Sequence, residues 1–111
     1  MKTLKFAPDL VAKILAGEKT STWRLFDDKD LHEGDTLMFV NKETFEEFGT
    51  ATITSLHTRT LGTLTDTDWE GHERFQSEEE MYKTYRMYYG EKVTQDTEVK
   101  ILSFKFIQKP G

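Results

Sequence analysis

Residues 17–24 hold the densest group of reactive side chains in the sequence: a lysine, three hydroxyls, an indole and an arginine. A threonine hydroxyl such as that of Thr22 is a useful nucleophile only with a base within hydrogen-bond reach. Lys19 could be that base, because burial lowers the pKa of a lysine. Arg24 offers a fixed fork of donors to a carbonyl, an oxyanion or a phosphate. These residue types favour a site for a small polar molecule, although solvated strand ends with ordinary β-forming threonines would read the same.

The geometry of a strand restricts which of these side chains can meet. Successive side chains alternate between the two faces, so Thr22 and Arg24 share one face and Trp23 lies on the other. Lys19 has the wrong parity to join Thr22. The two can converge only if the chain curls after Gly17, where glycine makes a left-handed backbone easy.

A second polar cluster, Trp-Glu-Gly-His-Glu-Arg at 69–74, contains two carboxylates and a histidine. A carboxylate here could orient a catalytic lysine, but a solvated acidic loop would look alike. His32, His57 and His72 are scattered without the spacing of metal ligands, so no metal site is expected. The sequence has no glycine-rich phosphate loop, and we expect no cofactor.

Composition limits the class of protein. A chain of 111 residues predicts a single domain over residues 1–111. The net charge of −5 disfavours nonspecific binding of long nucleic acid, but leaves open a local basic pocket or an uncharged nucleoside. The sequence has no cysteine, no signal-peptide pattern and no apolar run long enough to span a membrane. We therefore expect a cytoplasmic monomer with no membrane partner.

Hydrophobic periodicity predicts an α+β domain. The apolar stripe of residues 10–15 indicates a helix that begins at Pro8-Asp9 and stops at Gly17. Ser77 and Gly90 bracket a second helix, whose tyrosines at 82, 85 and 89 predict a packed face rather than a base-stacking platform. Strands are expected over 4–6, 19–26, 36–40, 50–60 and 99–106, with 36–40 central and one slip of register near Ser55. A short helix or loop is expected over 66–73. Five or six mostly antiparallel strands with two or three helices favour a small curled sheet or barrel.

The segment 17–24 resembles the G-x-K-x-x-x-x-R signature of the ASCH domain family. The order of the flanking pieces is similar too: Leu-Ala-Gly at 15–17, Glu-Gly-Asp-Thr-Leu at 33–37, Thr-Leu-Thr at 63–65 and Tyr-Gly at 89–90. The resemblance covers most of the chain. It implies the small β-barrel that the ASCH family shares with PUA RNA-binding domains.

Within that family, residues 16–24 are most similar to the A-G-x-K-T-x-T-x-R motif of small bacterial amidohydrolases of the YqfB type. The likeness implies hydrolysis of the N4-acetyl group of N4-acetylcytidine or related N4-acylated cytosines. It places the catalytic lysine at Lys19, the nucleophile at Thr22 and an oxyanion-stabilising arginine at Arg24. The family's glutamate falls in the acidic segment, at Glu73 or, one alignment away, at Glu70.

Further residues are expected to contact the substrate. Thr20, Glu70 and His72 flank the implied catalytic groups in the sequence. Trp23 could stack on the pyrimidine if its face of the strand lines the pocket, or it could be a core indole. Two other readings of the resemblance stay open. One is an RNA-binding or ribonuclease-like RNA-processing ASCH module, and the other is a nucleoside sensor without catalysis.

Overall fold

The computed structural model describes residues 1–110. Its elements, in chain order, are β1 (Lys2–Phe6), α1 (Pro8–Leu15), β2 (Ser21–Leu25), β3 (Thr36–Asn41), β4 (Glu47–Thr60), the 3₁₀ helices η1 (Leu61–Thr63) and η2 (Asp66–Trp69), α2 (Glu78–Tyr89) and β5 (Glu98–Gln108). Among the described residues, no helix has the length and apolar character needed to cross a membrane.

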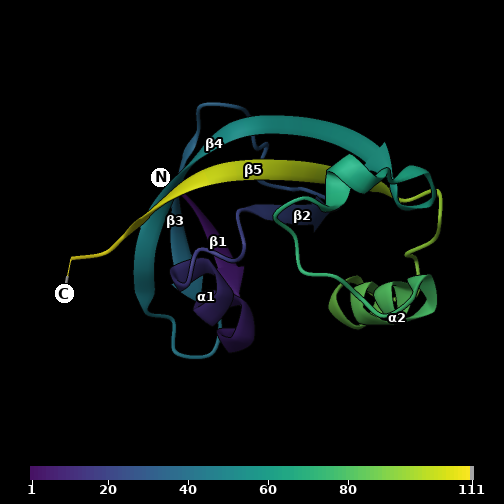
Figure 1. Cartoon of the computed structure of the whole chain (residues 1–111), viewed down its shortest axis with the longest axis horizontal. Helices are drawn as coiled ribbons and strands as arrows, with labels where there is room; N and C mark the ends of the chain where they lie inside the picture. The colour runs from purple at the N-terminus through teal and green to yellow at the C-terminus, as the bar shows by residue number, and fades with distance from the viewer. Residues whose placement is uncertain (111) are drawn as a thin grey trace.

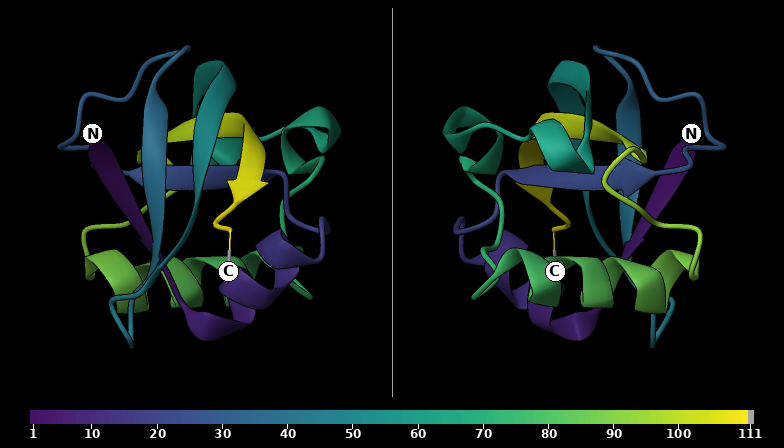
Figure 2. Two further views of the ribbon diagram at one scale, coloured as in Figure 1. Left: turned by 90° about the vertical axis from the view of Figure 1, so that its left-hand side faces the viewer. Right: turned by 90° about the vertical axis from the view of Figure 1, so that its right-hand side faces the viewer.

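The strands form one sheet in the order β1-β3-β4-β5-β2. Only β1 and β3 run parallel; the other neighbouring pairs are antiparallel. Figure 1 shows β4 and β5 arching over the molecule, with the sheet curling toward its two edge strands, β1 and β2. Both helices lie on the same side of the sheet, beneath its curved face (Figure 2). The predicted α+β class with a small curled, mostly antiparallel sheet is therefore confirmed.

The long strand β4 carries the predicted slip of register. Ile53 pairs with Phe104 of β5, whereas Ser55 pairs with Ser103, so Thr54 is bulged out of the ladder. A bulge increases the local bend and twist of a strand. This bend lets β4 and β5 cover both helices. In the strand order, β4 is the middle strand of the sheet. The segment 36–40, which was expected to be central, forms β3, an interior strand between β1 and β4.

Strand β2 is shorter than the segment 19–26 predicted for it. Gly17 has φ +78°, and the amide of Lys19 still donates to the carbonyl of Lys13 in α1, at 3.2 Å. Lys19 is thereby tied to the end of the helix and cannot join a ladder. The strand begins at Ser21, so the parity of a regular strand never applies to Lys19.

Two apolar clusters lie beneath the sheet. One packs α1, through residues such as Val11 and Ile14, against β1, β3 and β4. The other packs α2, through Met81 and Tyr85, against β2 and β5. Strand β2 carries Trp23 in the second cluster, and the site described next opens where the two clusters meet.

Candidate active site

Lys19 and Glu73 form a buried ion pair. The Lys19 side chain is fully enclosed, with 2% of the residue exposed, and its ammonium donates to Oε1 of Glu73. Burial lowers the pKa of the Lys19 ammonium, and the Glu73 carboxylate opposes part of that effect. Burial works to raise the pKa of the Glu73 carboxyl, yet the neighbouring His72 and Lys19 leave it below its usual value. Within residues 1–110, Glu73 is the only hydrogen-bond partner of the ammonium.

Gly71 brings the two partners together. Its carbonyl accepts hydrogen bonds from the amides of Thr20 and Ser21, at 2.9 and 3.0 Å. Gly71 has φ +74°, and a Cβ added there would lie 2.2 Å from Oγ1 of Thr20. Only glycine permits so close an approach with this backbone conformation. The loop that carries Glu73 is therefore locked to the segment between Lys19 and β2.

His72 supports the same loop from inside. Its Nδ1 donates to the carbonyl of Glu73 at 2.6 Å, which leaves Nε2 to accept from the hydroxyl of Tyr85 at 3.4 Å. Burial, followed by the charge of Lys19, lowers the pKa of His72 to about 4. A neutral imidazole is thus built into the site at neutral pH, and its hydrogen bond holds the backbone of Glu73 in place.

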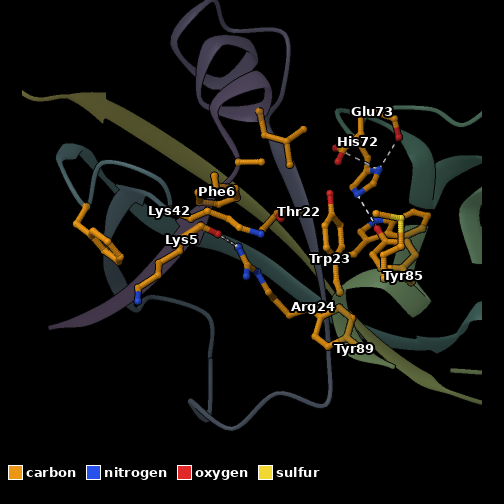
Figure 3. A pocket seen from close by; sticks show the side chains of 15 residues that line it. Lys5, Phe6, Thr22, Trp23, Arg24, Lys42, His72, Glu73, Tyr85 and Tyr89 are labelled. Atoms are coloured by element: carbon orange, nitrogen blue, oxygen red, sulfur yellow. Dashed lines mark hydrogen bonds and ion pairs between the residues drawn. The ribbon is translucent and has the colours of Figure 1, made fainter. Parts of the chain in front are cut away.

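A cavity of about 470 Å³ opens in front of Glu73. Its lining includes Thr22 and Arg24 from β2, and both point into it as strand parity predicts. Glu73 and His72 line the opposite wall, as Figure 3 shows. The volume matches that of typical small-molecule pockets. Lys19 does not line this cavity; it lies behind Glu73, which is the member of the ion pair that faces the opening.

Arg24 bridges the two edges of the sheet. Its Nη2 donates to the carbonyl of Lys5 on β1 at 3.2 Å, and its guanidinium lies 4.9 Å from the ring centroid of Phe6. Its Nε is buried without a hydrogen-bond partner in the described part of the chain. Burial lowers the pKa of Arg24, but an arginine stays protonated in proteins. The residue therefore supplies the cavity with a fixed positive charge.

Trp23 is a core residue, with 3% of it exposed. The ring of His72 stacks on it at 4.0 Å between centroids, and Trp69 packs against it at 4.5 Å. These neighbours leave no open face of the indole on which a pyrimidine could stack. Only part of Trp23 reaches the cavity wall.

Two of the expected substrate contacts lie outside the cavity. Thr20 is exposed and lines a separate depression, which Lys19 also lines. Glu70 is exposed, and its carboxylate has no hydrogen bond to any residue in 1–110. The resemblance left two glutamates, Glu70 and Glu73, as candidates for the partner of Lys19. In the structure the one that contacts Lys19 is Glu73. Among the described residues, no group of three or more potential ligands could hold a metal ion.

Sequence reasoning missed much of the cavity wall. Tyr85 and Tyr89 pack as a helix face, as predicted, yet they also line the cavity. Phe6 and Leu10 form another part of the wall, and Lys5, Lys42, Phe45, Met87 and Tyr88 surround the opening. These residues come from β1, α1, the β3–β4 turn and α2. No local pattern links segments so far apart in the chain.

The fold of this chain is similar to those of three solved structures. The match to protein EF3133 from Enterococcus faecalis V583, described as DUF984, has a TM-score of 0.74 and 14% identity, and covers 90% of this chain and 71% of that one. The ASCH domain from Lactobacillus crispatus JV V101 matches with a TM-score of 0.66 and 18% identity, over 88% of this chain and 70% of that one. The chain has an ASCH-like fold. ASCH from Zymomonas mobilis matches at 0.60 and 17% identity, over 93% and 65% of the two chains.

These identities are low, so the likeness shows the ASCH-like fold alone. No family model matches the sequence. No curated protein sequence matches it either. The chemistry of the site must therefore be argued from its own residues.

Proposed function

We propose that the chain is an amidohydrolase that removes the acyl group from N4-acetylcytidine or a related N4-acylated cytosine. The observation that carries the proposal is the buried Lys19–Glu73 pair, whose carboxylate faces a cavity that Thr22 also lines. Resemblance of residues 16–24 to the motif of such enzymes supports it. A buried lysine with a lowered pKa beside a carboxylate is a common feature of catalytic sites.

The reaction begins with attack of the Thr22 hydroxyl on the amide carbonyl. The base is the form of the pair in which Lys19 is a neutral amine beside the Glu73 carboxylate, a form that burial of the lysine favours, and the proton of the hydroxyl passes to it. Glu73 is the member of the pair at the cavity wall, so it receives the proton first and shares it with Lys19. The C–N bond then breaks, and the pair returns the proton to the departing N4 nitrogen. Water, activated by the same pair, hydrolyses the acyl-threonine.

Arg24 stabilises the negative charge that develops on the carbonyl oxygen. Its positive charge is fixed on the cavity wall by the carbonyl of Lys5 and the ring of Phe6, so little reorganisation is needed during the reaction. The pyrimidine would contact other aromatic rings of the wall, such as Phe6 and Tyr89, because the face of Trp23 is already covered by His72. His72 acts as a positioning residue through the backbone of Glu73.

The test is hydrolysis of N4-acetylcytidine, followed by release of cytidine. Thr22→Val and Lys19→Met should each lower kcat by about a thousand-fold or more, since removal of a nucleophile or its base has effects of this order. Thr36→Val removes an exposed hydroxyl from β3, outside the cavity, and should leave kcat unchanged. Mass spectrometry of the parent chain, rapidly quenched during turnover, should show one acyl group on the chain, and Thr22→Val should show none. Full activity of Thr22→Val would contradict the proposal.

An RNA-binding or RNA-processing module is the second candidate. Lysines and exposed aromatic rings surround the mouth of the cavity, and such surfaces bind single-stranded nucleic acid. This reading expects binding of a short RNA that weakens steeply with salt, without release of acetate from an acylated cytidine. The third candidate, a nucleoside sensor, expects tight binding of N4-acetylcytidine with no hydrolysis.

A further inference from the structure

Phe45 is the most exposed aromatic residue of the cavity wall. It lies in the turn between β3 and β4, and 69% of the residue is exposed. It belongs to neither of the apolar clusters beneath the sheet. The ammonium of Lys5 lies 5.3 Å from its ring centroid. An aromatic side chain stabilises a fold chiefly through the area that it buries, so the fold gains little from this ring.

The backbone of Phe45 is in a conformation that costs stability. Its φ is +62°, in the left-handed region that suits glycine and asparagine and disfavours a bulky side chain. Hydrogen bonds of the turn hold it there. The amide of Phe45 donates to the carbonyl of Asn41 at 2.8 Å, and the amide of Asn41 donates to the carbonyl of Glu46 at 2.9 Å. These bonds join backbone atoms, so the turn does not require an aromatic ring at position 45.

Phe26 is a close comparison, because its φ is +50° and 46% of the residue is exposed. Its ring does contribute to the fold. It packs edge-on against Tyr89 at 6.0 Å between centroids, and the ammonium of Lys92 lies 4.3 Å from its centroid. Phe26 does not line the cavity. Within the described residues, the aromatic packing that explains the Phe26 ring has no counterpart at Phe45.

The cavity accounts for what the fold does not. Phe45 lines it together with Lys5 and Phe6 of β1. Figure 3 shows the Lys5 side chain directed away from Glu73, and the Lys5 ammonium lies over the Phe45 ring. Phe45 is therefore on the part of the wall that lies away from Glu73. A strained backbone conformation is retained at a site where binding depends on it.

We propose that Phe45 is a ligand-binding residue, whose ring packs on the ligand where the ligand extends out of the cavity. The identity of that ligand rests on the proposed function. With the amide of an N4-acylated cytidine at Thr22 and Glu73, the outer part lies across the pyrimidine ring from C4, where N1 carries the ribose. A phenyl face packs well on such a flat or apolar surface. The role of Phe45 itself rests on its exposure, its strained backbone and its place on the cavity wall.

The first experiment measures what the ring costs the fold. Phe45→Asn removes the ring and introduces a residue that accepts the left-handed backbone, so the Tm of the ligand-free chain should rise by about 3 °C. Phe45→Tyr keeps both the ring and the strain, and should leave Tm unchanged. An unchanged or lower Tm in Phe45→Asn would show that the fold itself uses the ring, and would overturn the proposal.

The second experiment measures what the ring contributes to binding. Phe45→Asn should raise the KM for N4-acetylcytidine about tenfold with kcat unchanged, since a contact made equally in the ground and transition states changes KM alone. Phe45→Tyr should keep the parent KM. Phe26→Asn, which removes a similarly strained phenylalanine from outside the cavity, should keep it as well. An unchanged KM in Phe45→Asn, or an equal rise in Phe26→Asn, would overturn the proposal and leave the hydrolase intact.

Calorimetry with cytidine, the product of the proposed reaction, tests the contact without turnover. Phe45→Asn should weaken cytidine binding by a similar factor, and Phe26→Asn should not. If this pattern were found in a chain that does not hydrolyse N4-acetylcytidine, the role of Phe45 would be supported and the hydrolase overturned. A parent chain that neither binds cytidine nor hydrolyses its acetylated form would overturn both.

Discussion

The Lys19 ammonium is neutralised by the carboxylate of Glu73, 54 positions away in the chain. The two side chains differ in depth: 1% of the lysine side chain is exposed, against 18% for the glutamate. The lysine is therefore the member that cannot find water if the pair is broken. Fold stability and the proposed chemistry of the site therefore depend on the same contact.

Glu73→Gln tests this dependence. The variant keeps an acceptor for Lys19 but removes the opposing charge, so unfolding at pH 7 should become easier by about 2–3 kcal/mol. Without Glu73, the pKa of Lys19 is lowered further by burial. A group whose folded pKa lies below its unfolded value favours folding as pH rises between the two, so the deficit should shrink toward pH 10.

Chemical denaturation of both proteins across that range measures the deficit. Glu70→Gln is the matched control, since Glu70 is an exposed glutamate of the same loop. It should change stability by no more than about 0.5 kcal/mol. Equal stability of the two variants at pH 7 would show that the Lys19–Glu73 pair does not support the fold.

The local signals in the sequence were sufficient for the elements but not for the site. Ser77 and Gly90 bound α2 as predicted, because a side-chain cap and a positive φ are properties of a few consecutive residues. The bulge near Ser55 was visible as a break in alternation. The choice between Glu70 and Glu73 was not visible, because it depends on how the Gly71 carbonyl docks on Thr20. The walls of the cavity likewise come together only through the tertiary fold.

The buried His72 should make the fold sensitive to mild acid. Its folded pKa of about 4 lies below the ordinary value of 6.5, so the unfolded chain binds the proton first. Stability contributed by the neutral imidazole is full above pH 6.5 and is lost as pH falls toward 4. The difference amounts to about 3 kcal/mol.

Denaturation of His72→Asn at a series of pH values measures this contribution. The variant should be less stable than the parent chain at pH 7, but that difference should narrow between pH 6.5 and 4. His32→Asn replaces an exposed histidine and should follow the parent at every pH. A constant difference between His72→Asn and the parent would mean that His72 titrates normally in the fold.

Comparing Gly71→Ala with Gly34→Ala should separate the loss of stability caused by steric contact from the loss caused by backbone strain. The new Cβ would meet Oγ1 of Thr20 at 2.2 Å in a left-handed conformation, so both effects act and the loss should reach about 3 kcal/mol. Gly34→Ala has a similar φ of +87° with nothing within 4 Å, so it should show the strain alone, about 1 kcal/mol.

The steric contact introduced at Gly71 should also lower the activity of the site. Moving the loop displaces Glu73 from Lys19, so hydrolysis should fall in Gly71→Ala and persist in Gly34→Ala. Thr20→Ala in the Gly71→Ala background removes the hydroxyl that the Cβ would meet, and should restore part of both stability and activity. If the double variant were as unstable and as inactive as Gly71→Ala alone, the new Cβ would clash with a group other than the Thr20 hydroxyl.

Arg24→Lys should loosen the sheet where its two edges approach. The planar guanidinium both donates to the carbonyl of Lys5 and lies over Phe6, and an ammonium on a flexible stem cannot make both contacts. We expect a loss of about 1–2 kcal/mol and faster amide exchange in β1. Arg86→Lys is a close match outside the cavity, since Arg86 donates to the carbonyl of Val93 and lies over Tyr82. Both variants should lose similar stability, but only Arg24→Lys should lower kcat for N4-acetylcytidine, because Arg24 lines the cavity and Arg86 does not. Equal kcat in the two variants would remove Arg24 from the reaction and leave it as a brace between β1 and β2.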